Sequence, residues 1–365
     1  MRELLAVFFG CFFLISFCCA EMVMPSSITL DNDCNIYVIS GKGTWRFELQ
    51  KYASNGKLLS ILNKQTLALW ESDFDNFEKM PAKQIKDKFA SIVWYFKCQP
   101  TSLSIKDKII FPKMICSDTK NNIFTVGDDI SSKRIKFGIF DRNDGHPIKV
   151  FDVGGEGPEQ IRYPQGIAVD KDGTIYITNY WDHKVKVFDN NGRFIRSFGG
   201  KGSGDGQFKA IRAIAIDDKN GFVYVTDDFV PSYLFGTGDQ PYQMRVQKFT
   251  KDGRFVKKWG KNKFVRFNFG YPPIYWEPEL HGLKGIAVDS HGYVYVLTSY
   301  TREAHKFTGD GKLINKWGKV GSGEGEMRNP QAIAIDKDDN VYVADTDNNR
   351  IQKFDSNGKF LMEIK

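Results

Sequence analysis

Short apolar runs recur along this chain in a fixed order, and the order repeats six times. Each copy begins with an apolar run that ends at or beside an aspartate. A strand core of β-branched and aromatic residues follows, and an Asn-Gly or Asp-Gly pair comes later in the copy. A repeat of this kind indicates one supersecondary unit that buries its faces only against neighbouring copies. The six strand cores are Ile36-Tyr37-Val38, Ile123-Phe124-Thr125, Ile175-Tyr176-Ile177, Val223-Tyr224-Val225, Val294-Tyr295-Val296 and Val341-Tyr342-Val343.

The third copy shows the unit most clearly. Its pattern predicts strands over 166–170, 174–178, 184–188 and 193–198. Asn191-Gly192 supplies the positive φ angles of a two-residue hairpin turn, so the last two strands are expected to pair antiparallel. Four antiparallel strands in a repeating unit are typical of a propeller blade. The chain is therefore predicted to be an all-β, six-bladed β-propeller, with blades near 25–62, 112–152, 164–199, 211–260, 282–318 and 330–365.

Three insertions interrupt the period, at 63–110, 227–243 and 261–281. All three fall in connections that emerge on one face of a propeller, and long loops on a rigid scaffold often carry function. The first insertion, between blades 1 and 2, predicts a short helix over 82–97 with an apolar side and several lysines. We expect this helix to pack over the propeller. The alternative is a basic amphipathic helix that touches a membrane surface.

The insertions and the neighbouring loops are rich in aromatic residues. Rigid rings on exposed loops suit recognition of carbohydrate or peptide, because they bury area at a low cost in conformational entropy. The alternative is that the rings pack the long loops against one another. The candidates for binding are Trp45, Trp181, Tyr233, Tyr275 and Trp276.

One position before the innermost strand of each blade is expected to ring a mouth of the central channel. We call these six residues the mouth positions: Ser26, Lys113, Gln165, Arg212, Lys284 and Gln331. Three cations and three neutral polar groups favour a carboxylate, phosphate or sulfate group. The ligand would then be a protein, peptide or glycan with an acidic group. In the alternative, the cations pair with the loop acids Glu156, Glu159, Glu277, Glu279, Glu324 and Glu326.

Two segments resemble the NHL repeat: 342–355, YVADTDNNRIQKFD, and 163–170, YPQGIAVD. The resemblance covers nearly all of the chain after residue 20 and implies a six-bladed propeller. Many NHL proteins are also ubiquitin ligases with RING and B-box domains, but this chain has no Cys-x-x-Cys cluster. Some bind RNA, which the basic and aromatic run 261–267 would suit. The related peptidylglycine amidating lyases hold zinc with channel histidines, and the mouth positions here contain none.

Residues 1–20 predict a secretory signal peptide, with an apolar run from Leu4 to Phe17. An uncleaved anchor and lipidation remain open alternatives. Export leaves Cys34, Cys98 and Cys116 in the mature chain, and an odd count leaves at least one free thiol. We expect no Cys34–Cys98 disulfide, and Cys116 is expected to be inert in a strand.

The sequence offers few signals for catalysis or metal binding. The chain has 365 residues, a formal charge of +7 and five histidines without metal-ligand spacing. No catalytic residue and no cofactor motif is identified. A channel calcium or zinc stays an alternative without a sequence motif, since a calcium held by backbone carbonyls would leave no sequence signal. The leading hypothesis is an exported ligand-binding or protein-binding scaffold. A metal-assisted lyase or hydrolase is the alternative, and nucleic-acid binding ranks third, because fold alone does not decide function.

Overall fold

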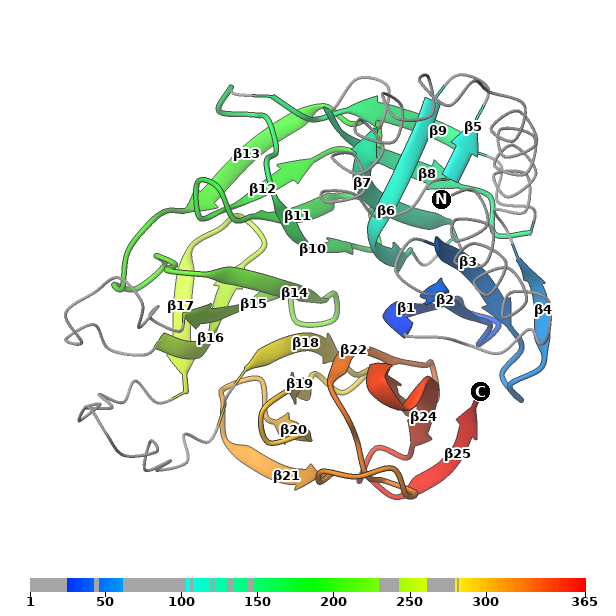
Figure 1. Cartoon of the computed structure of the whole chain (residues 1–365). Coiled ribbons are helices and arrows are strands. Elements are labelled where there is room, and N and C mark those ends of the chain that lie inside the picture. The colour runs from blue at the N-terminus through cyan, green and yellow to red at the C-terminus, as the bar shows by residue number, and fades with distance from the viewer. Residues whose placement is uncertain are drawn as a thin grey trace, which may run out of the picture.

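The described strands form six antiparallel sheets arranged around one axis (Figure 1). The computed structural model describes residues 25–42, 46–61, 103–105, 108–118, 120, 122–129, 134–143, 147–155, 157–229, 243–260, 280 and 282–365. Each sheet is built from strands that are consecutive in the chain. The prediction of a six-bladed, all-β propeller is confirmed.

The strands follow one another blade by blade. Blade 1 contains β1 (Pro25–Leu30), β2 (Ile36–Lys42), β3 (Arg46–Tyr52) and β4 (Leu58–Ile61); blade 2 contains β5 (Leu103–Ile105), β6 (Lys108–Ser117), β7 (Ile123–Asp129), β8 (Arg134–Phe140) and β9 (Pro147–Asp152). Blade 3 contains β10 (Pro164–Val169), β11 (Ile175–Asn179), β12 (Lys184–Phe188) and β13 (Phe194–Gly199); blade 4 contains β14 (Ile211–Asp217), β15 (Phe222–Phe229), β16 (Gln243–Thr250) and β17 (Phe255–Trp259). Blade 5 contains β18 (Leu283–Val288), β19 (Val294–Thr298), β20 (Glu303–Phe307) and β21 (Leu313–Trp317); blade 6 contains β22 (Pro330–Ile335), β23 (Val341–Asp345), the 3-10 turn η1 (Thr346–Asn348), β24 (Arg350–Phe354) and β25 (Phe360–Ile364).

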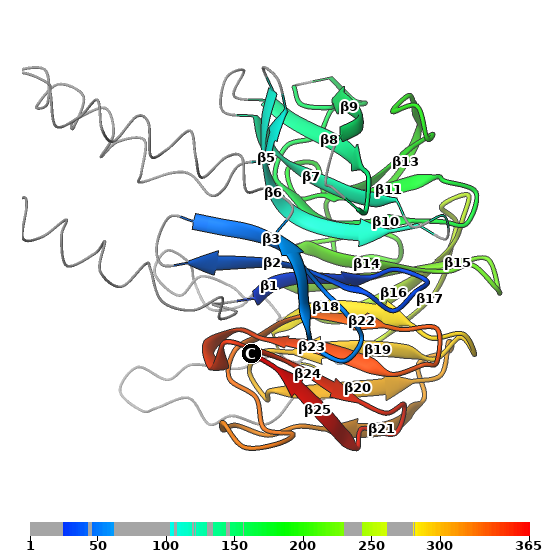
Figure 2. The same ribbon diagram turned by 90° about the vertical axis from the view of Figure 1, so that its right-hand side faces the viewer.

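The first strand of each four-stranded blade lies innermost, and side-chain packing closes the ring. The strands β1, β6, β10, β14, β18 and β22 contact one another in this order, and β22 contacts β1 (Figures 1 and 2). Between blades 1 and 6, Val38 and Tyr52 belong to the same buried cluster as Tyr342 and Ile351. The described strands of each blade come from one stretch of chain, so the two ends of the chain meet through their side chains.

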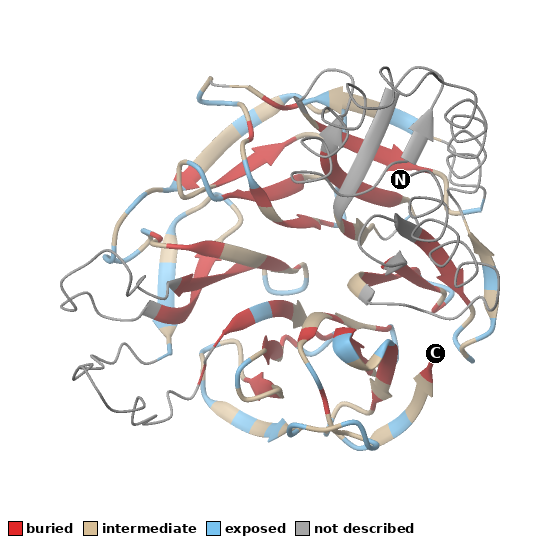
Figure 3. Cartoon of the chain, in the orientation of Figure 1, coloured by how far each residue is buried: buried red, intermediate tan, exposed pale blue. Residues whose placement is uncertain are grey.

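Burial follows the position of each strand in its blade. The middle strands β11, β19 and β23 are buried throughout, whereas outer strands such as β17 and β21 contain only intermediate and exposed positions (Figure 3). The middle strands read as continuous apolar runs because neighbouring blades cover both of their faces. Blade packing therefore explains the apolar strand cores of the repeat.

A buried tyrosine, an aspartate and a lysine explain the rest of the repeat pattern. In blade 6 the hydroxyl of Tyr342 donates to Asp336 at 3.1 Å, and the Lys353 ammonium lies 4.9 Å from the tyrosine ring centroid. Asp336 also accepts the backbone N–H groups of Asp338 and Asn340, at 3.0 and 2.8 Å. The aspartate closes the turn after the innermost strand and fixes the tyrosine, so burial leaves neither group unpaired.

The Asn-Gly and Asp-Gly turns differ from the predicted two-residue hairpins. Gly192 has φ 74°, but Asn191 is not among the residues with positive φ. The N–H of Gly192 donates to the carbonyl of Asp189 at 3.0 Å, and the strand register shifts between Val187 and Phe188. This is a longer turn with the glycine in a bulge. The antiparallel pairing is confirmed, whereas the two-residue turn is wrong, because only the glycine adopts the left-handed conformation.

The insertions are only partly described. Strand β5 pairs with the start of β6, so blade 2 has a fifth strand, and this strand lies within the predicted insertion 63–110. Residues 227–229 and 243 belong to the long strands β15 and β16. The predicted helix 82–97 and the centres of the other two insertions lie outside the described residues. Within the described ranges, no helix is long and apolar enough to cross a membrane.

The two described cysteines are free thiols. Burial raises the pKa of the Cys116 thiol, which fits the inert strand cysteine expected from the sequence. Cys34 is buried in the first turn of blade 1 and has φ 59°. Cys98 lies outside the described ranges.

Candidate ligand-binding site

Each of the six mouth positions lies at a β-bulge in the innermost strand of its blade. In blade 3, Pro164 pairs with Asn179 and Gly166 with Thr178, so Gln165 has no opposite residue. The same shift leaves out Ser26, Lys113 and Gln331, whereas in blades 4 and 5 it spans two residues, Arg212-Ala213 and Lys284-Gly285. Bulges re-aim side chains and often lie beside binding sites. The sequence position that we singled out is therefore the irregular position of every blade.

Blades 3 and 4 approach each other closely at this level. A Cβ atom on Gly166 would lie 3.1 Å from the carbonyl oxygen of Arg212. The hydroxyl of Thr178 donates to the same oxygen at 2.6 Å, and so joins the blades through the backbone of Arg212. Glycine is needed here because another backbone lies against it. This contact holds the bulges of Gln165 and Arg212 side by side.

Arg212 forms one wall of an open hollow. Its Nη1 donates to Oε1 of Gln165 at 3.1 Å, and its guanidinium carbon lies 5.8 Å from the ring centroid of Tyr180. The hollow has a volume of about 330 Å³ and is lined by Tyr163, Gln165, Tyr180 and Arg212. A guanidinium oriented by an amide and an aromatic ring is preorganised to pair with a carboxylate or phosphate.

Lys284 and Asp228 complete the charge arrangement around Arg212. Although Lys284 is exposed, the surrounding protein desolvates its ammonium group and lowers its pKa. The positive charge of Arg212 lowers this pKa further, and Asp228 acts in the opposite direction. The two cations therefore repel each other across neighbouring blades, and a bound anion would relieve that repulsion.

Sequence reasoning missed Asp228 at this site, and it also missed Tyr163, which lines the hollow. The side chain of Asp228 is 9% exposed, and its Oδ1 has no hydrogen-bond partner in the described part of the chain. Burial raises the pKa of its carboxyl group, whereas Arg212, the N–H of Leu283 and Lys284 lower it. The only sequence signal for Asp228 is its place at the end of a long strand. Its contact with Leu283 links two blades and therefore leaves no pattern within one repeat.

The predicted pairing with loop acids is not seen among the described residues. No described carboxylate forms an ion pair with Arg212 or Lys284. Glu326 instead pairs with Lys319 at 3.1 Å, while Glu159 and Glu324 are exposed. Glu156, Glu277 and Glu279 lie outside the described ranges.

The other predicted site residues either bond within their own blades or are not described. The hydroxyl of Ser26 donates to the carbonyl of Ile39 at 3.1 Å, and the amide of Gln331 donates to Asn329. The backbone of Lys113 lies in β6, but its side chain is not described. Trp45, Tyr233, Tyr275 and Trp276 lie outside the described residues. The structure thus brings together Gln165, Arg212 and Lys284.

Trp181 belongs to a group of exposed rings beside the hollow, which we call the aromatic ledge: Tyr163, Tyr180 and Trp181. Tyr163 and Trp181 are 59% and 58% exposed, and their ring centroids are 6.2 Å apart. The guanidinium of Arg162 lies 4.8 Å from the Trp181 ring. The N–H of Tyr180 donates to the carbonyl of Tyr163 at 3.1 Å. The ledge therefore adjoins the hollow.

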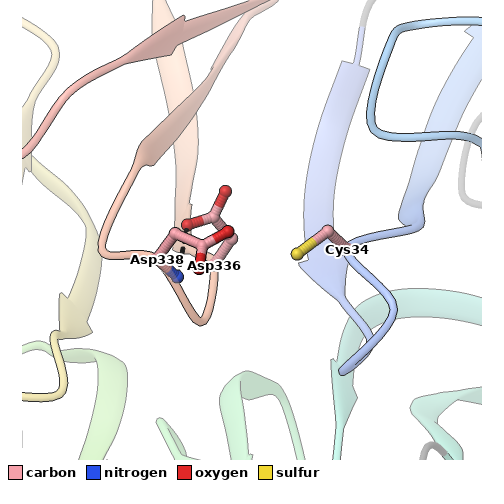
Figure 4. Close-up of side chains that lie close together, drawn as sticks. All are labelled: Cys34, Asp336 and Asp338. Atoms are coloured by element: carbon pink, nitrogen blue, oxygen red, sulfur yellow. Dashed lines mark hydrogen bonds between the residues drawn. The ribbon is translucent and has the colours of Figure 1, made fainter.

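Two groups of acidic residues with a histidine or cysteine lie elsewhere, between the turns of neighbouring blades. Cys34 faces Asp336 and Asp338 across the junction of blades 1 and 6 (Figure 4), and Asp289, His291 and Asp339 lie between blades 5 and 6. Asp336 already accepts bonds from Asn340 and Tyr342 and pairs with Lys353. His291 and Ser290 both pair with Asp339. These contacts fit turn closure better than metal binding.

The described histidines do not converge. His183 follows β11, His291 lies in the turn before β19, and His305 is buried in β20. Burial and the charge of Lys201 lower the pKa of His183. A zinc centre of converging imidazoles, as in the lyase hypothesis, finds no support among these three side chains.

Comparison with known families adds two matches. A family model for the NHL repeat matches residues 327–354, and one described as a 6-bladed beta-propeller matches residues 161–237. Protein brain tumor from Drosophila melanogaster is 24% identical over 159 residues, which are 44% of this chain and 13% of that protein. RING finger protein nhl-1 from Caenorhabditis elegans is 35% identical over 71 residues, 20% of this chain and 7% of that protein. The chain thus spans a small part of these relatives.

Solved structures share the architecture over almost the whole chain. Kuenenia stuttgartiensis hydrazine synthase superposes with a TM-score of 0.52 at 13% identity, covering 93% of this chain and 79% of that one. An inactive virginiamycin B lyase from Staphylococcus aureus, solved with quinupristin, gives a TM-score of 0.50 at 12% identity, with coverages of 95% and 86%. At this identity the likeness concerns the fold alone.

Proposed function

We propose that this chain, an NHL-repeat six-bladed β-propeller, is a protein-binding module that holds an acidic group of its partner at Arg212 and Lys284. The observation that carries the proposal is the placement of two cations on adjacent bulges, where the charge of Arg212 helps to lower the pKa of Lys284. An arrangement of like charges without an ion-pair partner in the described residues favours binding of an anion.

The neighbourhood of the two cations supports a protein partner. Arginine, tyrosine and tryptophan are the residues most enriched at the energetic centres of protein interfaces. Here Arg212, Tyr180, Tyr163 and Trp181 adjoin one hollow on the face of a rigid scaffold. Glycans with an acidic group are the main competing ligand class.

Charge reversal tests the proposal. The probe is a fluorescein-labelled hexaglutamate peptide, with hexaglutamine as its neutral counterpart, and binding is followed by fluorescence anisotropy. The double variant Arg212→Glu/Lys284→Glu should weaken hexaglutamate binding by roughly tenfold or more, because like charges then meet. Its control, Lys257→Glu/Lys312→Glu, makes the same change in net charge at exposed positions of the outer strand and turn. Equal effects of both pairs would mean non-specific attraction and would refute the site, as would binding of hexaglutamine with equal affinity.

The setting that we propose is extracytoplasmic, on the strength of the apolar run at Leu4–Phe17. Expression of the full chain in a secreting host should yield a protein whose N-terminus lies near residue 21. Retention of residues 1–20 on the purified protein would refute cleavage at this position.

A further inference from the structure

We infer that the site recognises an extended segment of the partner in which an aromatic residue directly neighbours the acidic one. The aromatic ring would pack on the aromatic ledge of Tyr163, Tyr180 and Trp181 while the carboxylate pairs with Arg212. This inference rests on the proposed function, because it adds a second contact to the same anion site.

The ledge and the cation form one continuous surface. Tyr180 connects them, because its backbone N–H bonds to the carbonyl of Tyr163 and its ring lies beside the Arg212 guanidinium. The ring of Trp181 lies against Tyr163 on one side and under Arg162 on another. A residue docked on the ledge therefore has its neighbour in the chain within reach of Arg212.

The exposure of the ledge indicates that it has a partner. Most of the other exposed large apolar side chains, such as Val256 and Ile314, occur one to an outer strand, where such exposure is ordinary. Tyr163 and Trp181 instead expose more than half of their surface side by side. Tyr163 does so at φ 54°, a left-handed conformation that is unusual for an aromatic residue. Adjacent rigid rings with an arginine beside them are typical of a docking surface.

The size and chemistry of the hollow favour side chains over a sugar. Its volume of about 330 Å³ lies at the small end of the roughly 300–1,000 Å³ range of ligand pockets. The amide of Gln165 is engaged at both ends, since its Oε1 accepts from Arg212 and its Nε2 donates to the carbonyl of Pro164. A glycan needs many polar partners, whereas an aromatic ring and one carboxylate match the rings and the guanidinium that line this hollow.

The local charges indicate an acidic partner as well. Arg162 lies against Trp181 of the ledge, Arg212 lines the hollow, and the charge of Lys284 interacts with that of Arg212. The nearby Asp182 is already paired with the Lys186 ammonium at 2.8 Å and accepts the Asn179 amide at 2.6 Å. Asp228, whose charge interacts with those of Arg212 and Lys284, is buried.

A set of short peptides separates the two contacts. The probes are fluorescein-labelled, end-capped tetrapeptides: Gly-Trp-Glu-Gly, Gly-Ser-Glu-Gly and Gly-Trp-Gln-Gly. Each is titrated against the full-length protein and against the variants Trp181→Ser and Arg212→Ala. Tyr300→Ser is the matched control, because Tyr300 is 54% exposed at the corresponding turn of blade 5.

The inference predicts that the effect of each exchange in the peptide on affinity depends on one side chain of the protein. Exchanging tryptophan for serine in the peptide should weaken binding about fivefold with the unaltered protein and with Tyr300→Ser, but less than twofold with Trp181→Ser. Exchanging glutamate for glutamine should weaken binding to the unaltered protein by more than it weakens binding to Arg212→Ala, in which Lys284 still attracts the carboxylate.

The outcomes distinguish failure of the aromatic ledge from failure of the proposed anion site. If the glutamate depends on Arg212 but the tryptophan does not depend on Trp181, the ledge inference is overturned and the anion site stands. If neither dependence is found, both are overturned. Equal losses with Trp181→Ser and Tyr300→Ser would also overturn the ledge, because the effect would not be local.

Discussion

Gly311 of blade 5 lies against the indole ring of Trp259 in blade 4. A Cβ atom on this glycine would come within 2.5 Å of Cδ2 of the tryptophan. The same contact recurs around the ring, between the turn glycine of one blade and the outer strand of the preceding one: Gly192 with Phe151, Gly253 with Phe198, Gly358 with Trp317, and Gly56 with Ile364. The last pair joins blades 1 and 6. The glycine of the repeat thus shapes the turn and also lets neighbouring blades meet.

Replacing Gly311 should lower the free energy of unfolding by more than the strain of its positive φ angle alone explains. Gly311→Ala should lower the free energy of unfolding by about 2–4 kcal/mol, because it adds a clash in a packed interface to the strain of positive φ. Gly221→Ala is the control: Gly221 also has positive φ, but its Cβ would meet nothing within 4 Å. Its cost should be about 1 kcal/mol. Urea denaturation measures both, and equal losses would contradict the steric role.

Asp228→Asn should stabilise the protein at neutral pH. Burial raises the pKa of this carboxyl in the folded state, so its ionised form is disfavoured there. The native protein then loses stability as the pH rises from the ordinary aspartate pKa through the raised value. The variant should gain on the order of 1 kcal/mol at pH 7 and nothing at pH 3. Denaturation at the two pH values measures this, and a loss at pH 7 would show that attraction to Arg212 and Lys284 outweighs burial.

The same variant should bind the acidic probe more tightly. The substitution removes a negative charge that interacts with Arg212 and Lys284. Affinity for the hexaglutamate peptide should rise several-fold. Asp252→Asn is the control, since Asp252 is exposed and pairs with Arg254 in an outer turn. An equal rise with the control would assign the effect to net charge.

A buried arginine should hold the loop between blades 3 and 4. Arg245 donates to Asp227 at 3.2 Å and to the carbonyl groups of Ser203, Gly204 and Gln207. Arg245→Met removes the cation that pairs with the buried Asp227 carboxylate, while Lys209 and Ala210 still donate their backbone N–H groups to it. The substitution should cost about 3–5 kcal/mol. The exposed Arg254 pairs with Asp252 at 2.9 Å, and Arg254→Met should leave the free energy of unfolding nearly unchanged, because solvent screens this pair. Thermal or urea unfolding distinguishes the two, and similar losses would contradict this account of the loop.

Zinc should not stabilise the protein through Cys34. The Asp336 carboxylate beside it is already engaged by Asn340, Tyr342 and Lys353. Added zinc should therefore change the melting temperature of Cys34→Ser and of the unaltered protein equally. A rise in the unaltered protein that Cys34→Ser abolishes would establish a metal site at the junction of blades 1 and 6.

The fold could be predicted from the sequence because the residues that define a blade recur in each repeat. The aspartate, the buried tyrosine and the turn glycine recur at fixed places, and each interacts within its blade or with a neighbouring one. The turn type was not accessible, since Asn-Gly fits both a two-residue hairpin and a longer turn with a glycine bulge. Only the observed φ angles distinguish them.

The candidate site was accessible only in part. Counting back from the innermost strand locates Gln165, Arg212 and Lys284, because every blade has its bulge at this position. Asp228 could not be assigned, since its role depends on the end of β15 lying against the start of β18. Such a contact between blades leaves no pattern within either repeat.

The most direct test of the proposed anion site is the pKa of Lys284 itself. Reductive methylation with ¹³C gives each lysine an NMR signal, and Lys284→Arg assigns the relevant one. The account predicts a pKa below the ordinary lysine value in the free protein, and a rise when the hexaglutamate peptide binds, because a carboxylate then offsets the charge of Arg212. The signal of Lys257 should not change. An unchanged pKa of Lys284 in the presence of bound peptide would contradict the account.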